Sequence, residues 1–133
     1  MIYFENEYAI VEFISNRRVV KMHWKNPHSD SACYRLTLTK ALVITKQYDV
    51  KGWLSDLSNL SFVRDEDLQW IMCTVAPSMK RYPSLKKIAF VGEKKILDLF
   101  NTEIMRISSK KGRIKIKYFK TEKPAVKWLL RRL

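Results

Sequence analysis

The chain has 133 residues and a formal net charge of +13, and 47% of its residues are hydrophobic. This composition excludes an intrinsically disordered chain. The length is that of one domain, which can fold without disulfides or metals. Residues 1–79 contain as many acidic as basic side chains, so the whole positive excess lies in residues 80–133. We therefore predict a single domain over 1–133 whose second half attracts anionic partners.

The first half of the chain predicts strands followed by a helix. Residues 8–14 and 18–24 are rich in β-branched and aromatic types and predict two strands joined by a hairpin turn, after a short first strand. Apolar residues at helical spacing then predict a helix over 30–47. Residues 52–57 indicate a strand that is buried on both faces.

The second half continues the alternation of helices and strands. A helical stripe of apolar residues predicts a helix over 65–79, and 87–91 is a short apolar strand. Weaker periodicity indicates a helix over 96–104. Basic and apolar residues alternate in 113–119, which predicts a strand, and a final helix begins at Thr121. This order predicts an α/β fold, a mixed β-sheet covered by about four helices.

No segment of the chain predicts a membrane span. The longest uncharged stretch, 68–79, is shorter than the roughly 20 residues that a spanning helix needs. The acidic N-terminus is not that of a signal peptide. We therefore expect a cytoplasmic protein with no transmembrane segment.

The carboxylates concentrate at Asp56, Asp65, Glu66 and Asp67. Paired carboxylates serve in acid–base catalysis or in Mg²⁺ binding, but no nucleophile, histidine or glycine-rich loop stands near these in the sequence. Three acids at the start of a helix instead stabilise the positive end of its dipole. We predict no catalytic residue, no metal and no cofactor.

The basic residues near the C-terminus are candidates for anion binding. Alternation in 113–119 places three of them on one face of a strand, and the final helix directs three more outward; the set is Arg113, Lys115, Lys117, Lys127, Arg131 and Arg132. Such a set can track the phosphates of a nucleic acid. Lysines also protect an exposed edge strand from pairing with another sheet, or simply form a solvated surface.

The run from Trp53 to Leu68, WLSDLSNLSFVRDEDL, resembles the strand–loop–helix of STAS domains, the anti-sigma-factor antagonist family, and the chain as a whole is similar to small stand-alone STAS-like bacterial proteins. The resemblance implies a mixed sheet with helices packed on it and a function through binding. In the antagonists a serine at the start of the helix accepts a phosphate. Here that position is Asp65 and the next is Glu66, so a kinase switch should be absent.

The resemblance implies a regulatory module, not an enzyme, that binds an unknown protein partner through the loop and the following helix. The residues expected to meet the partner are Asp56, Ser58, Ser61, Arg64, Asp65, Glu66 and Asp67. A nucleic-acid-binding domain that uses the basic residues of 80–133 is the main alternative. A carrier of a small molecule or lipid is another, and a homo-oligomer is compatible with each of these functions.

Overall fold

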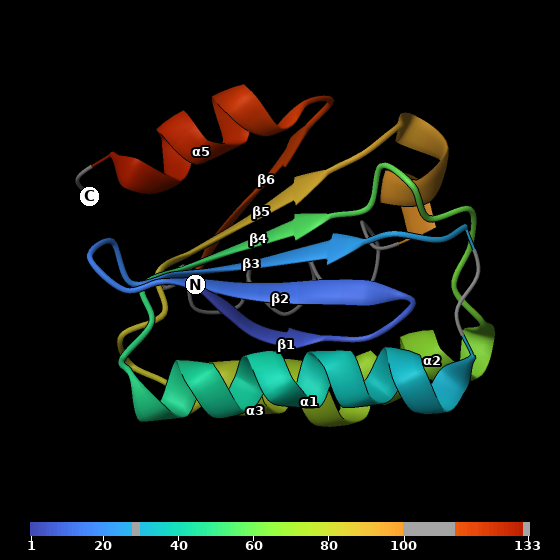
Figure 1. Cartoon of the computed structure of the whole chain (residues 1–133), viewed down its shortest axis with the longest axis horizontal. Coiled ribbons are helices and arrows are strands. Elements are labelled where there is room, and N and C mark those ends of the chain that lie inside the picture. The colour runs from blue at the N-terminus through green and yellow to red at the C-terminus, as the bar shows by residue number, and fades with distance from the viewer. Residues whose placement is uncertain (28–29, 100–113, 132–133) are drawn as a thin grey trace.

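The computed structural model describes residues 1–27, 30–99 and 114–131. One six-stranded sheet runs through these ranges, and its strands lie side by side in the order of the sequence (Figure 1). The strands are β1 (Ile2–Glu5), β2 (Ala9–Ile14), β3 (Val19–Trp24), β4 (Gly52–Asp56), β5 (Lys87–Val91) and β6 (Lys115–Phe119). Strands β1 to β3 pair antiparallel, whereas β3 to β6 are parallel. The sheet is therefore mixed, as predicted.

Helices cover the sheet on both faces. They are α1 (Ser31–Gln47), α2 (Asp65–Trp70), the π-helical segment η1 (Ile71–Val75), α3 (Ala76–Lys80) and α5 (Glu122–Leu130), and residues 94–99 are also helical. Because α2, η1 and α3 follow one another without a break, the described ranges contain four covering elements. The predicted α/β fold, a mixed sheet covered by about four helices, is confirmed.

The order of the strands explains how the helices are distributed. Each parallel strand is added on the same side of the one before it, and connections between parallel strands are almost always right-handed. All connecting helices must therefore lie on one face, and Figure 1 shows α1, α2 and α3 together beneath the sheet. The opposite face is covered by α5, which contacts β4, β5 and β6. The outer faces of β2 and β3 are only partly covered, and apart from Val19, which is buried under α5, they carry both polar and apolar side chains.

The main core lies between the sheet and α1. Alternate residues of β2 are buried there, and Trp24 at the end of β3 stacks on Tyr34 of α1 with ring centroids 4.8 Å apart. Trp53 on β4 donates its ring N–H to the Thr45 hydroxyl at 2.7 Å. This bond satisfies the polar atom of a tryptophan that is only 2% exposed, so α1 is fixed in position along β4.

A smaller core lies under α5. Leu129 of α5 packs on β4 beside Gly52, where an added Cβ would lie 3.2 Å from the Leu129 Cδ2. The absence of a side chain at Gly52 therefore sets how closely α5 approaches the sheet. At the end of α5, the Lys87 Nζ donates to the backbone oxygens of Trp128 and Arg131 at 2.7 and 3.1 Å.

Two of the predicted helices differ from the structure in detail. The helix predicted over 65–79 forms, but it contains the π-helical segment, which the apolar stripe did not indicate. The helix predicted over 96–104 is described only to residue 99, and the remainder of that prediction lies outside the described residues. Within the described ranges, no helix has both the length and the apolar character that crossing a bilayer requires.

Candidate functional site

The first candidate site is the acidic loop, defined as residues 58–67, which follows the carboxyl end of β4. Its start is fixed by Asp56, whose Oδ1 accepts hydrogen bonds from the Ser58 backbone N–H and hydroxyl at 3.0 and 2.6 Å. Further along, the Ser61 N–H donates to the Pro27 oxygen at 2.9 Å. Apolar side chains anchor this stretch in the core, namely Leu57, Leu60 and Val63. Both backbone hydrogen bonds and buried side chains therefore hold the loop against the rest of the domain.

The end of the acidic loop is joined to α1 by a buried carboxylate. Asp67 is 2% exposed and accepts hydrogen bonds from the Ser31 hydroxyl and from the Arg35 Nε, each at 2.9 Å. The Arg35 guanidinium also lies 5.4 Å from the centre of the Trp70 ring. These contacts fix the first turn of α2 against the first turn of α1.

The predicted loop residues therefore divide into two groups. Asp56 and Asp67 are buried and bind groups within the chain. The other predicted residues are exposed: Ser58, Ser61, Arg64, Asp65 and Glu66. Phe62, which the sequence analysis did not include, is 44% exposed on the same loop. An exposed aromatic ring beside two exposed acids gives this surface both an apolar and an electrostatic contact.

Asp56 also reaches the open face of the sheet, where its Oδ2 lies 3.0 Å from the Nδ1 of His23. Burial by itself raises the pKa of Asp56, but hydrogen bonds from Ser58 and His23 outweigh it and hold the pKa below its usual value. The pair borders a polar hollow of about 280 Å³ that also contains Lys21 and Glu122, which form an ion pair at 2.9 Å. The described lining includes no serine, cysteine or threonine that could act as a nucleophile.

The predicted anion-binding residues lie apart from the acidic loop. Lys115 and Lys117 are exposed on β6, which is an edge strand, and Lys127 and Arg131 are exposed at α5 and its end. The two remaining members of the predicted set, Arg113 and Arg132, lie outside the described residues. Lys115 pairs in register with Lys87 at the amino end of β5, whereas the acidic loop follows the carboxyl end of β4.

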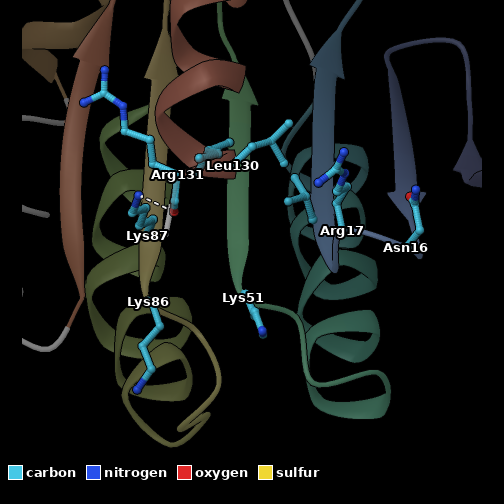
Figure 2. Close-up of a pocket in the computed structure, with 9 residues that line it drawn as sticks. Asn16, Arg17, Lys51, Lys86, Lys87, Leu130 and Arg131 are labelled. Atoms are coloured by element: carbon cyan, nitrogen blue, oxygen red, sulfur yellow. Dashed lines mark hydrogen bonds between the residues drawn. The ribbon is translucent and has the colours of Figure 1, made fainter. Parts of the chain in front are cut away.

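The second candidate site is the basic groove, a hollow of about 580 Å³ at the amino ends of β3, β4 and β5. Its cations are Arg17, Lys51, Lys86, Lys87 and Arg131, and the part of the chain that the structure describes contributes no carboxylate to its lining. Figure 2 shows Lys51 and Lys86 at the entrances of β4 and β5, Arg17 on the turn before β3, and Arg131 at the end of α5. The structure thus joins one predicted residue, Arg131, to cations that the sequence analysis had not selected.

A signal for these cations was present in the sequence. Lys51 immediately precedes β4, Lys86 immediately precedes β5, and Lys115 begins β6. Because the amino ends of parallel strands meet at one edge of a sheet, a basic residue at the start of each strand predicts a basic edge. Counting charge by halves of the chain hid this pattern, since Arg17 and Lys51 belong to the half with no net charge.

Comparisons of the chain with protein-family models, with curated proteins and with solved structures found no match. Among the residues that the structure describes, no group of three or more histidine, cysteine, aspartate or glutamate side chains is placed to hold a metal ion. The acidic loop and the basic groove are therefore the features of the described chain that indicate a function.

Proposed function

We propose that the chain is a non-enzymatic interaction module of the STAS type, which binds a protein partner through the acidic loop and α2. The observation that carries this proposal is the exposure of Phe62, Asp65 and Glu66 on a loop whose base is fixed. A loop that is already ordered loses little conformational entropy when a partner binds. The resemblance to the antagonist family points to the same loop.

The chemistry of the loop limits the kind of partner. Phe62 requires an apolar pocket, because burying an aromatic ring is the main source of affinity at such a contact. Asp65 and Glu66 favour basic side chains around that pocket and steer the encounter. Asp65 stands at the position where the antagonists of the STAS family carry a phosphorylated serine, and Glu66 is its neighbour, so we infer that the surface stays acidic at all times and that the partner binds without a kinase step.

The experiment is a pull-down in which the wild-type chain is compared with the variants Phe62→Ser and Glu66→Lys, followed by titration of the purified partner into each protein. Phe62 and Glu66 are exposed, so both variants should fold, which thermal melting would check. The matched control is Glu12→Lys, the same charge reversal on the open face of β2. We expect both loop variants to weaken binding at least about tenfold, because they affect the centre of the contact. Equal binding by all four proteins would exclude the loop as the interface.

A nucleic-acid-binding domain is the alternative proposal, supported by the exposed Lys115, Lys117 and Lys127. Each phosphate that a lysine neutralises releases counterions, so affinity would fall steeply between about 50 and 200 mM salt. Fluorescence anisotropy with short single-stranded and double-stranded oligonucleotides measures this slope. A shallow slope, or no binding at low salt, would reject the alternative.

A further inference from the structure

The cations of the basic groove are not neutralised by the rest of the described chain. Within residues 1–27, 30–99 and 114–131, none of the cations that line the groove forms an ion pair with a carboxylate. Like charges that share one hollow repel one another, and that repulsion is relieved when an anion enters. The groove is thus prepared electrostatically for a negatively charged ligand.

Backbone hydrogen bonds set the spacing of these cations. The Lys51 N–H donates to the Arg18 oxygen, the Lys86 N–H to the Lys51 oxygen, and the Lys115 N–H to the Lys86 oxygen, each at 2.8 Å. This chain of bonds places three lysines at the starts of neighbouring strands, which are about 4.8 Å apart. Lys51 and Lys86 line the groove, whereas Lys115 lies next to its lining in the sheet. Figure 2 shows Lys51 and Lys86 extending outward from the strand entrances. Their long, flexible stems allow the ammonium groups to turn toward a ligand.

Lys87 differs from the other cations because it forms part of the wall. It is 5% exposed, and its bonds to the Trp128 and Arg131 oxygens hold the last turn of α5 over the sheet. Figure 2 shows the bond to Arg131. Burial, together with the nearby charges of Arg131 and Lys115, lowers the pKa of Lys87. The direction of this shift agrees with a positive potential at the groove.

The groove also has an apolar part. Val19, Leu129 and Leu130 contribute to its lining, and Leu130 is 42% exposed although it is a large hydrophobic side chain. An inorganic anion alone would leave this surface in water. A ligand with an apolar group next to its charge would cover it.

We propose that the basic groove binds a small ligand in which a phosphate monoester is joined to an apolar group. Such a phosphate carries a charge between about −1.5 and −2 near pH 7, which suits a hollow lined by several lysines and arginines better than a carboxylate does. A volume of about 580 Å³ lies within the range of small-molecule sites. The confinement of these cations to the lining of one hollow favours a compact ligand over a long polyanion. A soluble phosphate ester and a phosphorylated lipid headgroup both present this group, so the site would recognise the same chemistry in either.

The test is calorimetric titration with hexyl phosphate, and with inorganic phosphate and hexanol as its separate parts. We expect hexyl phosphate to bind more tightly than either part. The variant Lys51→Gln/Lys86→Gln should weaken it by about tenfold or more, because two charged contacts are lost. Leu130→Asn should weaken hexyl phosphate and leave inorganic phosphate unchanged. Lys87 is not replaced, because its side chain holds α5 in place.

The matched control is Lys120→Gln/Lys123→Gln, which removes the same charge from exposed positions near the start of α5, outside the groove. We expect it to change binding by less than about twofold, as for remote surface charges. An equal loss in this control, or no binding of hexyl phosphate to the wild-type chain, would overturn the proposal.

Two further titrations identify the source of the phosphate and the competing class of ligand. Binding to phosphatidic acid vesicles but not to phosphatidylcholine vesicles would assign the phosphate to a lipid headgroup, and binding of hexyl phosphate with no vesicle binding would assign it to a soluble compound. A single-stranded DNA of about 12 nucleotides that binds more tightly than hexyl phosphate, and that Lys51→Gln/Lys86→Gln weakens, would replace the proposal with nucleic-acid binding.

Discussion

Charged side chains at the two ends of the parallel strands differ in how they are paired. At the carboxyl end, buried carboxylates are paired within the chain, Asp56 with His23 and Ser58, and Asp67 with Ser31 and Arg35. At the amino end, the backbone groups are paired but the cations have no carboxylate partner among the described residues. Charge that is paired internally stabilises the fold, whereas charge that is left unpaired at the surface is available to a ligand. The comparison predicts that substitutions at the two ends will have different consequences for stability.

The largest loss of stability should follow the removal of Arg35, because the variant Arg35→Met leaves the Asp67 carboxylate buried without its cation. Breaking a buried pair costs about 3–5 kcal/mol, and we expect about 2 kcal/mol here because Ser31 remains bonded to Asp67 and Arg35 is partly exposed. Urea unfolding measures the change. The control Lys46→Met, on an exposed position of the same helix, should cost less than about 0.5 kcal/mol.

At the amino end, the most sensitive position should be one with no charge, Gly52. The variant Gly52→Ala places a Cβ 3.2 Å from the Leu129 Cδ2, so Leu129 must move or α5 must lift. We expect a loss of about 1–2 kcal/mol, the usual cost of overpacking a core. Shortening the partner in Gly52→Ala/Leu129→Ala should give less than the sum of the two single losses. Simple additivity would mean that α5 is not seated on Gly52.

A smaller effect, confined to acid, should come from Asp56. Its pKa is lower in the folded chain than in the unfolded chain, where it is about 3.9, so the folded state holds fewer protons as the pH falls. The stabilisation from Asp56 is complete above the unfolded pKa and is lost as the pH falls through the lower folded value. We expect thermal stability to decrease more steeply between about pH 5 and pH 3 in the wild-type chain than in Asp56→Asn. Parallel curves would show that other carboxylates dominate.

The smallest effect on stability should be that of Lys51→Gln/Lys86→Gln. No carboxylate partner is lost, so we expect the free energy of unfolding to change by less than about 0.5 kcal/mol, or to rise slightly as repulsion is relieved. Salt screens the same repulsion, and it should raise the melting temperature of the wild-type chain more than that of the variant. A marked loss of stability would show that these lysines have partners within the chain.

Most elements of the fold were predictable because their signals are local. The stripe at Tyr34, Leu38 and Leu42 predicted α1, and Asp30 caps it by accepting a hydrogen bond from the Cys33 N–H. The pairing of His23 with Asp56 was not predictable, because it depends on the parallel register of β3 and β4. Register is set by packing across the whole sheet and leaves no mark in a short stretch of sequence.

The candidate sites were predicted less completely than the fold. The sequence selected Asp65 and Glu66, which are exposed, but it could not separate them from Asp67, whose burial depends on contacts with Ser31 and Arg35 about thirty positions earlier in the chain. It also located positive charge by chain position, although Arg17 and Arg131 line one groove only when the sheet forms.

The π-helical segment between α2 and α3 keeps the buried side chains of this run on one side of the helix. Four of the buried positions along this run, Asp67, Ile71, Val75 and Met79, recur every fourth residue, and Ala76 is buried beside them in the sequence. In an α-helix each residue turns about 100°, so a spacing of four residues overshoots a full turn by about 40°. Over the three spacings from Asp67 to Met79, the buried side chain would rotate by about 120° away from the line of Asp67. The wider turn, in which the Ala76 N–H bonds to the Ile71 oxygen, absorbs part of this drift. Deleting one of the exposed residues of this segment, Cys73 or Thr74, would therefore uncouple the orientation of the acidic loop from that of the core, although every buried side chain of the run is still present.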